Sequence, residues 1–386
     1  EICGRICPQD RLCEGNCVIE QSGHGTVTIG SVEKYLTDLA WENGWVKPIK
    51  PLRERTESVG IIGAGPGGLA AADVLRRQGV QVTVYDRYDR AGGLMTYGIP
   101  GFKLEKPVVM QRIEQLETAG VIFVLNCAVG VDLSFDAIRG QHDAVLIATG
   151  VYKSRDIAAP GVGATGVVRA LDYLTASNRK SFGDDVPEFD NGELNAAGKR
   201  VVVIGGGDTA MDCVRTAIRQ GATSVKCLYR RDKANMPGSQ REVQNAEEEG
   251  VDFVWLTAPK AFTGGDTVTG VIVQRMRLGD ADASGRQSPE VIEDADYTEP
   301  ADLVVQALGF EPENLPTLWG VKELAVTRWG TVKADFRTHA TNLPGVYAAG
   351  DIVRGASLVV WAIRDGREAA DSILAYLSQP AMVAAE

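Results

Sequence analysis

The chain has 386 residues, of which 44% are hydrophobic and 24% are charged, and its formal net charge at pH 7 is −11. That length predicts two or three domains with room for a hydrophobic core, and the negative charge argues against nucleic acid or an anionic membrane as a partner. No apolar stretch approaches the roughly 20 residues that a membrane span requires, and no secretory signal is present, so we expect a cytoplasmic protein.

The first seventeen residues hold four of the seven cysteines, spaced C-x3-C-x5-C-x3-C: Cys3, Cys7, Cys13 and Cys17. Disulfides are not expected in a cytosolic chain. The spacing matches neither the usual zinc knuckles nor the common ferredoxin runs, so an iron–sulfur cluster, a zinc ion and no metal all stay open. One helix, Val32–Glu42, is expected before a linker at 46–51. The chain begins inside this segment, which predicts further residues upstream of Glu1.

A glycine-rich turn follows the first buried strand that the sequence predicts, Val59–Ile62. Gly63, Gly65 and Gly68 stand in G-x-G-x-x-G register. The first permits a tight turn, the second lets a pyrophosphate approach the backbone, and the third lets the helix pack close to the strand. The helix expected to begin near Pro66 would turn its free N–H groups toward the phosphates.

The following residues are expected to alternate between helices and short apolar strands. A loop is expected at 90–101, a helix over Pro107–Ala119 and a buried strand over 144–150. The polar segment 180–197 predicts an interdomain loop. This alternation predicts parallel sheets in an α/β fold.

The glycine motif recurs after a second buried strand, Val201–Ile204, with three residues in register: Gly205, Gly207 and Ala210. A helix over 238–250, hairpin-like strands and a buried strand over 303–309 are expected to complete this second unit. The repetition predicts a second dinucleotide site.

The two units differ in the charge at the end of the strand that follows each turn. Asp86 ends the first of these strands, whereas Arg230 and Arg231 end the second. A carboxylate accepts hydrogen bonds from ribose hydroxyls, and an arginine accommodates a ribose 2′-phosphate. The first site is therefore predicted to bind FAD or NAD, and the second NADP. Two different dinucleotides on one chain imply hydride transfer between them.

A third stretch near the C-terminus is also expected to contact a cofactor. After a strand that ends at Ala349, Gly350 would allow a cofactor to approach closely and Asp351 would accept a hydrogen bond from a cofactor hydroxyl. A helix starting at Gly355–Ala356 would point its N-terminus at a flavin.

Few side chains are expected to take part in the chemistry itself. Hydride moves directly from nicotinamide to flavin, so no catalytic side chain is predicted. The histidines are scattered and are expected at the surface or in packing: His24, His142 and His339. The remaining cysteines are expected to be small buried residues: Cys127, Cys213 and Cys227.

The two glycine turns, the strand end at 148–150 and the Ala-Ala-Gly-Asp stretch at 348–351 resemble the two-dinucleotide-binding-domain flavoproteins, which include glutathione and thioredoxin reductases. The second unit has no C-x-x-C dithiol, so thioredoxin or disulfide reductase activity is disfavoured. The N-terminal cysteines, Gly92–Gly93, the loop 97–100 and the stretch 236–238 are similar, more narrowly, to the small (β) subunits of bacterial NADPH-dependent glutamate synthases.

That resemblance implies an α/β fold of two Rossmann-like, glutathione-reductase-like domains with part of an N-terminal helical iron–sulfur domain. It implies that FAD is bound by the first unit and the C-terminal stretch: Gly63, Gly65, Gly68, Asp86, Gly93, Thr149, Gly350 and Asp351. It implies that NADPH is bound by the second unit: Gly205, Gly207, Asp208, Thr209, Arg230 and Arg231. Hydride would pass from NADPH to FAD.

The resemblance also implies an electron route and a partner. Cys7, Cys13 and Cys17 would ligate [4Fe–4S] clusters, Cys3 fits the same cysteine pattern, and Glu33 is a further candidate near iron. Electrons would pass through the clusters to the FMN of the glutamate synthase large (alpha) subunit, which forms L-glutamate from glutamine and 2-oxoglutarate. Only part of the cluster ligand set is expected in this chain.

Two alternatives remain open. A related NADPH/ferredoxin oxidoreductase or a dihydropyrimidine-dehydrogenase-type electron-transfer subunit would share every motif, and only the partner chain would tell them apart. A non-catalytic module that senses NADP(H) is the alternative of another class.

Taken together, the motifs predict the following domains: 1–50, the C-terminal part of the iron–sulfur domain; 57–170, the first part of the FAD domain; 171–310, the NADPH domain; 311–378, the return of the FAD domain; and 379–386, a tail.

Overall fold

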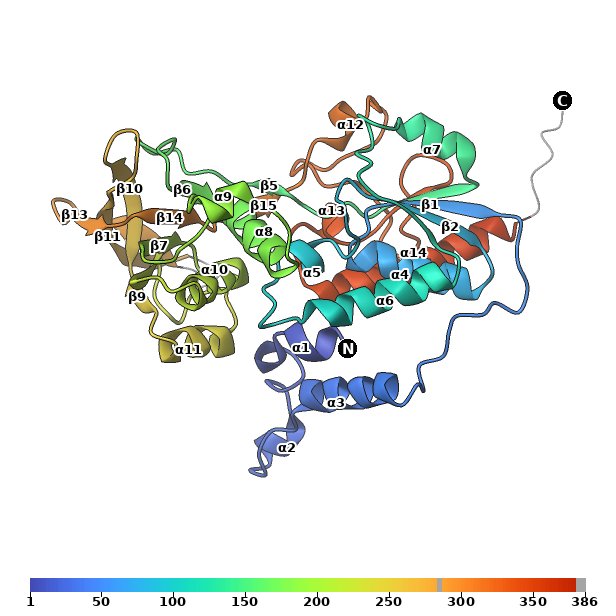
Figure 1. Ribbon diagram of the computed structural model, residues 1–386, viewed down its shortest axis with the longest axis horizontal. Helices are drawn as coiled ribbons and strands as arrows, with labels where there is room; N and C mark the ends of the chain where they lie inside the picture. The colour runs from blue at the N-terminus through green and yellow to red at the C-terminus, as the bar shows by residue number, and fades with distance from the viewer. Residues whose placement is uncertain (283–286, 380–386) are drawn as a thin grey trace.

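A computed structural model describes residues 1–282 and 287–379. Four short elements form the N-terminal segment, on one side of the molecule (Figure 1): α1 (Cys3–Ile6), η1 (Gln9–Arg11), α2 (Val18–Gln21) and α3 (Ile29–Glu42). The predicted helix is therefore α3, which begins three residues earlier than expected. The linker at 46–51 leads from this segment to the first sheet.

The first unit is built on a five-stranded parallel sheet with the order β16-β4-β1-β2-β3. Its strands are β1 (Ser58–Ile62), β2 (Gln81–Tyr85), β3 (Ile122–Val124), β4 (Ala144–Ile147) and β16 (Val346–Ala348). Alternate strand residues pack into two cores because successive side chains of a strand point to opposite faces.

Helices cover both faces of this first sheet (Figure 1). One core lies under α4 (Pro66–Arg77), α6 (Lys106–Thr118) and α14 (Val359–Leu377). The other lies under α7 (Phe135–Gln141) and α12 (Leu315–Leu318). Two short helices, α5 (Leu94–Tyr97) and α13 (Asp351–Arg354), begin directly after glycines, Gly93 and Gly350.

The second unit repeats the plan with the strand order β6-β14-β7-β8-β9, again all parallel. Its strands are β6 (Val167–Arg169), β7 (Arg200–Ile204), β8 (Ser224–Tyr229), β9 (Asp252–Trp255) and β14 (Leu303–Gln306). One face packs on α8 (Ala170–Ser181), α10 (Asp208–Arg219) and α11 (Gln240–Glu248). The parallel sheets that the sequence predicted are thus confirmed.

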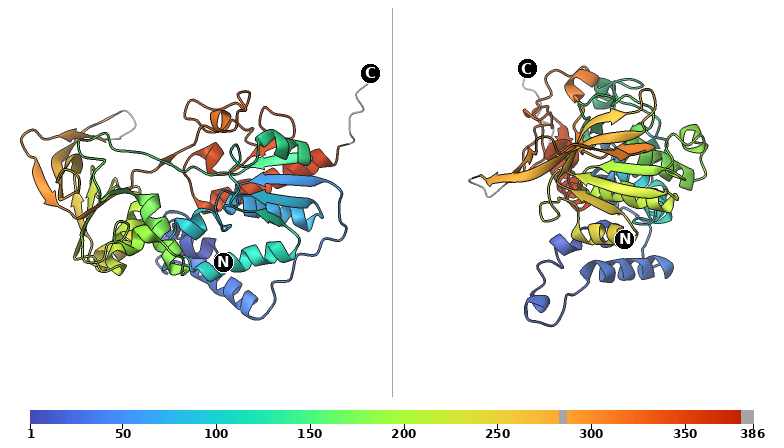
Figure 2. Two further views of the ribbon diagram at one scale, coloured as in Figure 1. Left: turned by 45° about the horizontal axis from the view of Figure 1, so that its top comes forward. Right: turned by 90° about the vertical axis from the view of Figure 1, so that its left-hand side faces the viewer.

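The other face of the second sheet packs on an antiparallel layer, which confirms the hairpin-like strands. This layer contains β10 (Thr257–Thr263), β11 (Gly270–Ala281), β12 (Gln287–Val291) and β13 (Tyr297–Pro300). An antiparallel pair, β5 (Lys153–Ser154) and β15 (Phe310–Glu311), joins the two units where the chain passes from the first unit to the second and back again. Figure 2 shows the two units on either side of this crossing.

Three local expectations differ from the structure. No helix starts at Gly355–Ala356, because α13 ends at Arg354 and α14 begins at Val359. The segment 180–197 is not a loop throughout, since it contains α9 (Pro187–Asp190). The strand β6 lies within 57–170 but pairs with β14 of the second sheet. Of the expected tail, 380–386 lies outside the described residues. Within the described part, no helix combines the length and apolar character needed to cross a membrane.

Candidate functional site

A cavity of about 700 Å³ lies where the N-terminal segment and the two sheet units meet. Residues from all three parts line it, among them Cys7, Gly65, Asp351 and Asp208. Parallel strands bring their carboxyl ends to one edge of a sheet, which explains why the turn after β1 and the stretch after β16 face the same space. The cavity is therefore the place where two dinucleotides and a cysteine-held group could meet.

The first glycine turn has the shape that a bound pyrophosphate requires. Gly63 has φ +110°, and a Cβ there would lie 2.3 Å from the Ala148 carbonyl oxygen. A Cβ on Gly68 would lie 2.0 Å from the Gly63 oxygen, so the helix approaches the turn closely. At Gly65, by contrast, a Cβ would meet no described atom within 4 Å. Gly65 therefore opens onto the cavity at the N-terminus of α4.

Asp86 links the end of β2 to this turn. Its carboxylate accepts the Ala64 N–H at 2.7 Å and the Tyr88 N–H at 2.9 Å. Burial raises the pKa of Asp86, while the two N–H groups act in the opposite direction. The carboxylate also lines the cavity, where its remaining lone pairs can accept hydrogen bonds from ribose hydroxyls.

Thr149 and Gly93 complete the first site. The Thr149 hydroxyl is buried and has no hydrogen-bond partner among the described residues, although it lines the cavity. A buried hydroxyl without a partner is costly, so a bound polar group is expected beside it. Gly93 lies against the turn, because a Cβ on it would be 2.9 Å from the Gly65 Cα.

The C-terminal stretch reaches the same cavity through Gly350 and Asp351. Burial raises the pKa of Asp351 to about 6, while the backbone N–H of Ser357 acts in the opposite direction. The structure thus brings together six of the eight residues proposed for FAD along the cavity wall: Gly63, Gly65, Asp86, Thr149, Gly350 and Asp351. Gly68 and Gly93 support the wall rather than line it.

The second glycine turn repeats the geometry of the first two glycines of the first turn. A Cβ on Gly205 would lie 2.2 Å from the Ala307 carbonyl oxygen, whereas one on Gly207 would meet no described atom within 4 Å. Asp208 and Thr209, the first residues of α10, line the cavity. Asp208 accepts the Ser239 N–H at 2.9 Å.

The two arginines predicted for the second site follow the end of β8, outside the cavity lining. Arg230 is exposed. The Nε of Arg231 is buried and has no acceptor anywhere in residues 1–282 or 287–379. A buried guanidinium nitrogen without a partner is expected beside a bound anion, since charged groups are expensive to bury unpaired.

The four N-terminal cysteines are partly exposed, and Cys3 and Cys7 line the cavity. Burial, with the neighbouring Cys3 and Cys13, raises the pKa of Cys7 to about 11. A hydrogen bond from the Val27 N–H, at 3.5 Å from its sulfur, lowers the pKa of Cys17. The bound cations of an iron–sulfur cluster would favour the thiolate form at all of these positions.

The spacing of the sulfurs argues against a preformed zinc site. A tetrahedral zinc site with Zn–S bonds of about 2.3 Å places its sulfurs within roughly 4 Å of one another. No three of the four described cysteine sulfurs lie within 4.8 Å of one another.

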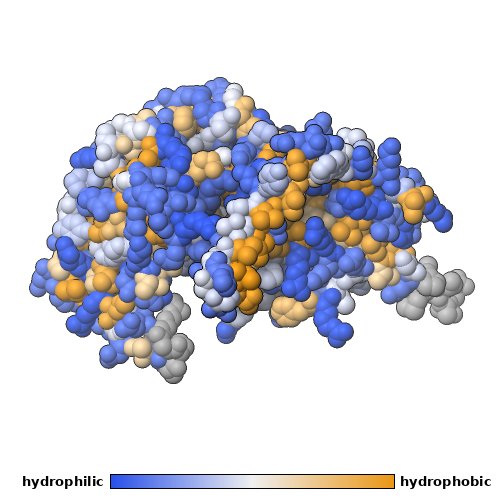
Figure 3. Space-filling model, turned by 90° about the horizontal axis from the view of Figure 1, so that it is seen from below, coloured by the Kyte–Doolittle hydropathy of each residue, from blue (hydrophilic) through white to orange (hydrophobic). Residues whose placement is uncertain are grey.

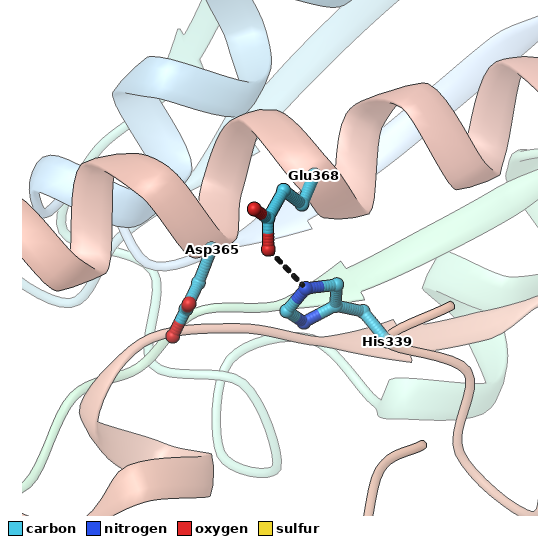
Figure 4. A group of neighbouring side chains, drawn as sticks. All are labelled: His339, Asp365 and Glu368. Atoms are coloured by element: carbon cyan, nitrogen blue, oxygen red, sulfur yellow. Dashed lines mark hydrogen bonds and ion pairs between the residues drawn. The ribbon is translucent and has the colours of Figure 1, made fainter. Parts of the chain in front are cut away.

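The buried cysteines and the histidines match their predicted packing roles. Cys127, Cys213 and Cys227 are buried. His339 is 5% exposed, and its Nε2 lies 3.5 Å from a Glu368 oxygen (Figure 4). Asp365, drawn beside them, forms two hydrogen bonds with Arg354, at 2.5 and 2.6 Å. Because that carboxylate already has a cationic partner, we interpret the group as structural.

A set of interdomain contacts was missed by sequence reasoning. Lys103, on the loop before α6, lies 2.7 Å from Asp212 and 3.4 Å from Glu242 of the second unit. Burial opposes its charge, but the attraction of Asp212 and Glu242 outweighs burial and raises the pKa of Lys103 to about 12. Burial raises the pKa of Asp212 to about 6. No local pattern indicates these contacts, since Lys103 lies more than one hundred positions from both Asp212 and Glu242 in the sequence.

A hydrophobic surface on α2 and α3 was also not predicted. Large apolar side chains of this part are exposed, including Val18 (70%) and Leu36 (57%). Figure 3, which views the side where α2 and α3 lie, shows a hydrophobic band across that face. Contiguous exposed apolar surface is typical of interaction sites.

Comparison with known proteins agrees with this geometry. Residues 57–366 match the family model of pyridine nucleotide-disulphide oxidoreductases, and residues 1–45 match that of dihydropyrimidine dehydrogenase domain II, 4Fe-4S cluster. The glutamate synthase [NADPH] small chain of Azospirillum brasilense is 67% identical over 390 residues, which cover 100% of this chain and 81% of that protein. A Cereibacter sphaeroides protein provisionally given the same name is 82% identical over 386 residues, with 100% and 93% covered.

Solved structures share the fold at much lower identity. FprA from Mycobacterium tuberculosis is 21% identical, with a TM-score of 0.70 over 84% of this chain and 85% of that one. This likeness extends over both sheet units.

Proposed function

The chain belongs to the glutamate synthase small-chain family of pyridine nucleotide-disulphide oxidoreductases, and on that premise we propose that it passes electrons from NADPH, through FAD and cysteine-held [4Fe–4S] clusters, to the FMN of a large partner subunit. That subunit would use them to form L-glutamate from glutamine and 2-oxoglutarate. One observation carries the proposal: the first glycine turn, the N-terminal residues of α10 (Asp208 and Thr209), and Cys3 and Cys7 line the same cavity.

The residues of the first site fit FAD. The N-terminus of α4 and the open space at Gly65 suit the pyrophosphate, and the Asp86 carboxylate suits the adenosine ribose. The unpartnered Thr149 hydroxyl and Asp351 suit the polar groups nearer the flavin ring. When bound, FAD would accept a hydride and release electrons singly, which no side chain here can do. The protein supplies binding, orientation and exclusion of water.

The residues of the second site fit NADPH. We propose that the backbone of Gly205, Gly207, Asp208 and Thr209 surrounds its pyrophosphate at the N-terminus of α10. Arg230 and Arg231 would bind the 2′-phosphate, and the unpartnered Nε of Arg231 supports this choice. The nicotinamide would then extend into the shared cavity, toward the flavin.

Cys7, Cys13 and Cys17 are proposed cluster ligands, with Cys3 and Glu33 as further candidates. Burial, with the neighbouring Cys3 and Cys13, raises the pKa of Cys7, so these three thiols lie close to one another. Because Cys3 and Cys7 line the cavity, a cluster held there would lie beside the proposed FAD site and could accept its electrons.

The partner is proposed to be the glutamate synthase large (alpha) subunit. Its name is implied by the small-chain relatives. We propose that it covers the hydrophobic surface of α2 and α3, because Val18 and Ile19 directly follow Cys17 and a receiving cofactor must come close to the cluster. We also retain the predicted domain boundaries and a cytoplasmic location as proposals. The net charge of −11 argues against nucleic acid as a partner.

A dihydropyrimidine-dehydrogenase-type electron-transfer role is the second candidate, favoured by the family match of residues 1–45. The two functions differ in the partner that accepts the electrons.

The test is anaerobic addition of NADPH to the purified protein, followed by supply of the large subunit with glutamine and 2-oxoglutarate. The proposal expects the flavin absorbance to bleach and glutamate to form. Bleaching without glutamate formation, together with pyrimidine reduction in the presence of a dihydropyrimidine dehydrogenase partner, would favour the second candidate. A protein without flavin, or one whose flavin does not respond to NADPH, would contradict both.

A further inference from the structure

The loop 232–239, here called the NADPH loop, lies against the second glycine turn. The Gly238 N–H donates to the Gly206 carbonyl oxygen at 2.9 Å. The next residue, Ser239, donates its N–H to the Asp208 carboxylate at 2.9 Å. Asp208 begins α10, at the end of that helix where the pyrophosphate is proposed to bind. The NADPH loop therefore fixes the position of a charged side chain at the NADPH site.

The N-terminal segment, here called the cysteine segment because it carries Cys3, Cys7, Cys13 and Cys17, also contacts this loop. Asp10 lies between Cys7 and Cys13, and one of its oxygens accepts the Ser239 hydroxyl at 2.9 Å. Its other oxygen accepts the Gln240 N–H at 3.2 Å. Neighbouring residues reinforce the contact: Arg11 donates to the Pro237 oxygen at 2.6 Å, and Glu14 pairs with Arg241.

The contact from Asp10 caps the N-terminus of α11. This helix begins at Gln240, and the side chain of its N-cap residue, Ser239, caps none of its described N–H groups. Free N–H groups at a helix start prefer an acceptor, and a carboxylate there is favoured by the helix dipole. Asp10 supplies that carboxylate from a different part of the chain, more than two hundred residues away. The start of α11 and the NADPH loop thus depend on the cysteine segment.

We propose that Asp10 is a positioning residue for NADPH binding. By capping α11 and holding Ser239, it keeps Asp208 turned toward the NADPH loop and away from the phosphates, whose negative charge a carboxylate would repel. The cysteine segment and the NADPH site are then coupled. By linkage, NADP⁺ binding tightens the hold of the NADPH loop on the cysteine segment to the same extent. This inference rests on the proposed function, because it takes the second turn as the NADPH site.

Two variants test it from opposite sides of the contact. Asp10→Ala removes both acceptors, and Ser239→Ala removes the hydroxyl donor but keeps the N–H to Asp208. In the flavin-containing protein, we expect the Kd for NADP⁺, measured by isothermal titration calorimetry, to rise about five- to tenfold for Asp10→Ala and by a smaller factor for Ser239→Ala. The double variant should bind no more weakly than Asp10→Ala alone, because the two residues share one interaction.

Glu42→Ala is the matched control. Glu42 is an exposed carboxylate of the same N-terminal segment, with no ion-pair or hydrogen-bond partner for its side chain among the described residues. We expect it to leave the Kd unchanged. We also expect the flavin and iron contents of the Asp10 and Ser239 variants to match those of the unaltered protein, and the rate of flavin reduction at saturating NADPH to stay within about twofold, so that KM changes and kcat does not.

Limited trypsin digestion provides a readout that needs no cofactor. Lys233 is exposed in the NADPH loop, and its cleavage should be faster in Asp10→Ala than in Glu42→Ala. If Asp10→Ala loses iron or fails to fold, Ser239→Ala decides the matter. NADP⁺ affinity and cleavage rates equal to those of the control would overturn the inference while leaving the proposed function intact. An unaltered protein that binds no NADP⁺ would instead refute the proposed function.

Discussion

Replacing Arg231 with methionine should convert a preference for NADPH into near indifference between the two nicotinamide coenzymes. The Arg231 Nε is buried without a partner among the described residues, so it is placed to receive an anion rather than to support a fold contact. A charge-assisted hydrogen bond contributes about 1.5–3 kcal/mol. At about 1.4 kcal/mol per factor of ten, its loss lowers kcat/KM for NADPH about ten- to hundredfold.

NADH lacks the 2′-phosphate, so its kcat/KM should change by no more than about twofold. The assay is ferricyanide reduction by the purified protein, with each coenzyme in turn. Lys233→Met is the matched control, because Lys233 is a nearby cation already paired with Glu247 at 2.8 Å. Adding the change at Arg230, which is exposed, should have a smaller effect. An equal loss for NADPH and NADH, or no loss for either, would refute the assignment of this strand end to the 2′-phosphate.

Three further predictions concern the flavin site and the cysteines. Gly65→Val places a side chain in the space proposed for the pyrophosphate, so the protein should purify without yellow colour. Gly163→Val, at a position equally open in the described structure, is the control and should keep its FAD. Equal FAD content in the two variants would contradict the proposed pyrophosphate position. Asp351→Asn should weaken FAD binding yet stabilise the FAD-free protein at pH 7 by up to about 3 kcal/mol, because a buried carboxyl whose pKa is raised to about 6 destabilises the fold once it ionises. The FAD-free unaltered protein should therefore gain stability as pH falls from about 6 toward 4. The denaturant midpoints of the unaltered protein and Asp351→Asn should converge over this pH range. A constant difference between the midpoints would contradict the claim that ionised Asp351 destabilises the fold. Cys7→Ala or Cys13→Ala should remove cluster absorbance and iron while leaving NADPH–ferricyanide activity largely intact. The control Cys213→Ala should keep both the iron and the activity. Normal iron content in the first two variants would mean that Cys7 and Cys13 are structural.

The parts of the site that could be predicted are those encoded in short segments. The first glycine turn requires a tight turn at Gly63 and an open approach at Gly65, and these two residues are only two positions apart. Asp86 was predicted from the charge that ends its strand and lines the cavity, whereas the role of Arg231, predicted in the same way, stays a prediction. In each case local backbone chemistry dictates the residue type.

The parts that could not be predicted depend on contacts between distant segments. Lys103 reaches Asp212 across the interface between the two units, and Asp10 reaches Ser239 from the cysteine segment. No periodicity or spacing indicates such pairs. The start of α14 was predicted too early because Gly355 suggested a helix start, whereas in the structure Gly355 is the C-cap residue of α13.

The boundary between the two units was blurred for a related reason. The strand β6 has only three residues, Val167–Arg169, and gains its place by pairing with β14 far along the chain. Short strands carry little pattern of their own, so their sheet is set by tertiary pairing.

The most direct test of the central claim is the reduction of the flavin by NADPH that carries deuterium at the transferred position, followed anaerobically by stopped-flow absorbance. If NADPH and FAD meet in the shared cavity, the flavin bleaches in a single hydride transfer, and bleaching slows several-fold with the deuterated coenzyme when transfer limits the rate. Oxidation of NADPH with no flavin bleaching would contradict the account, because the electrons would then leave by a route that the cavity does not provide.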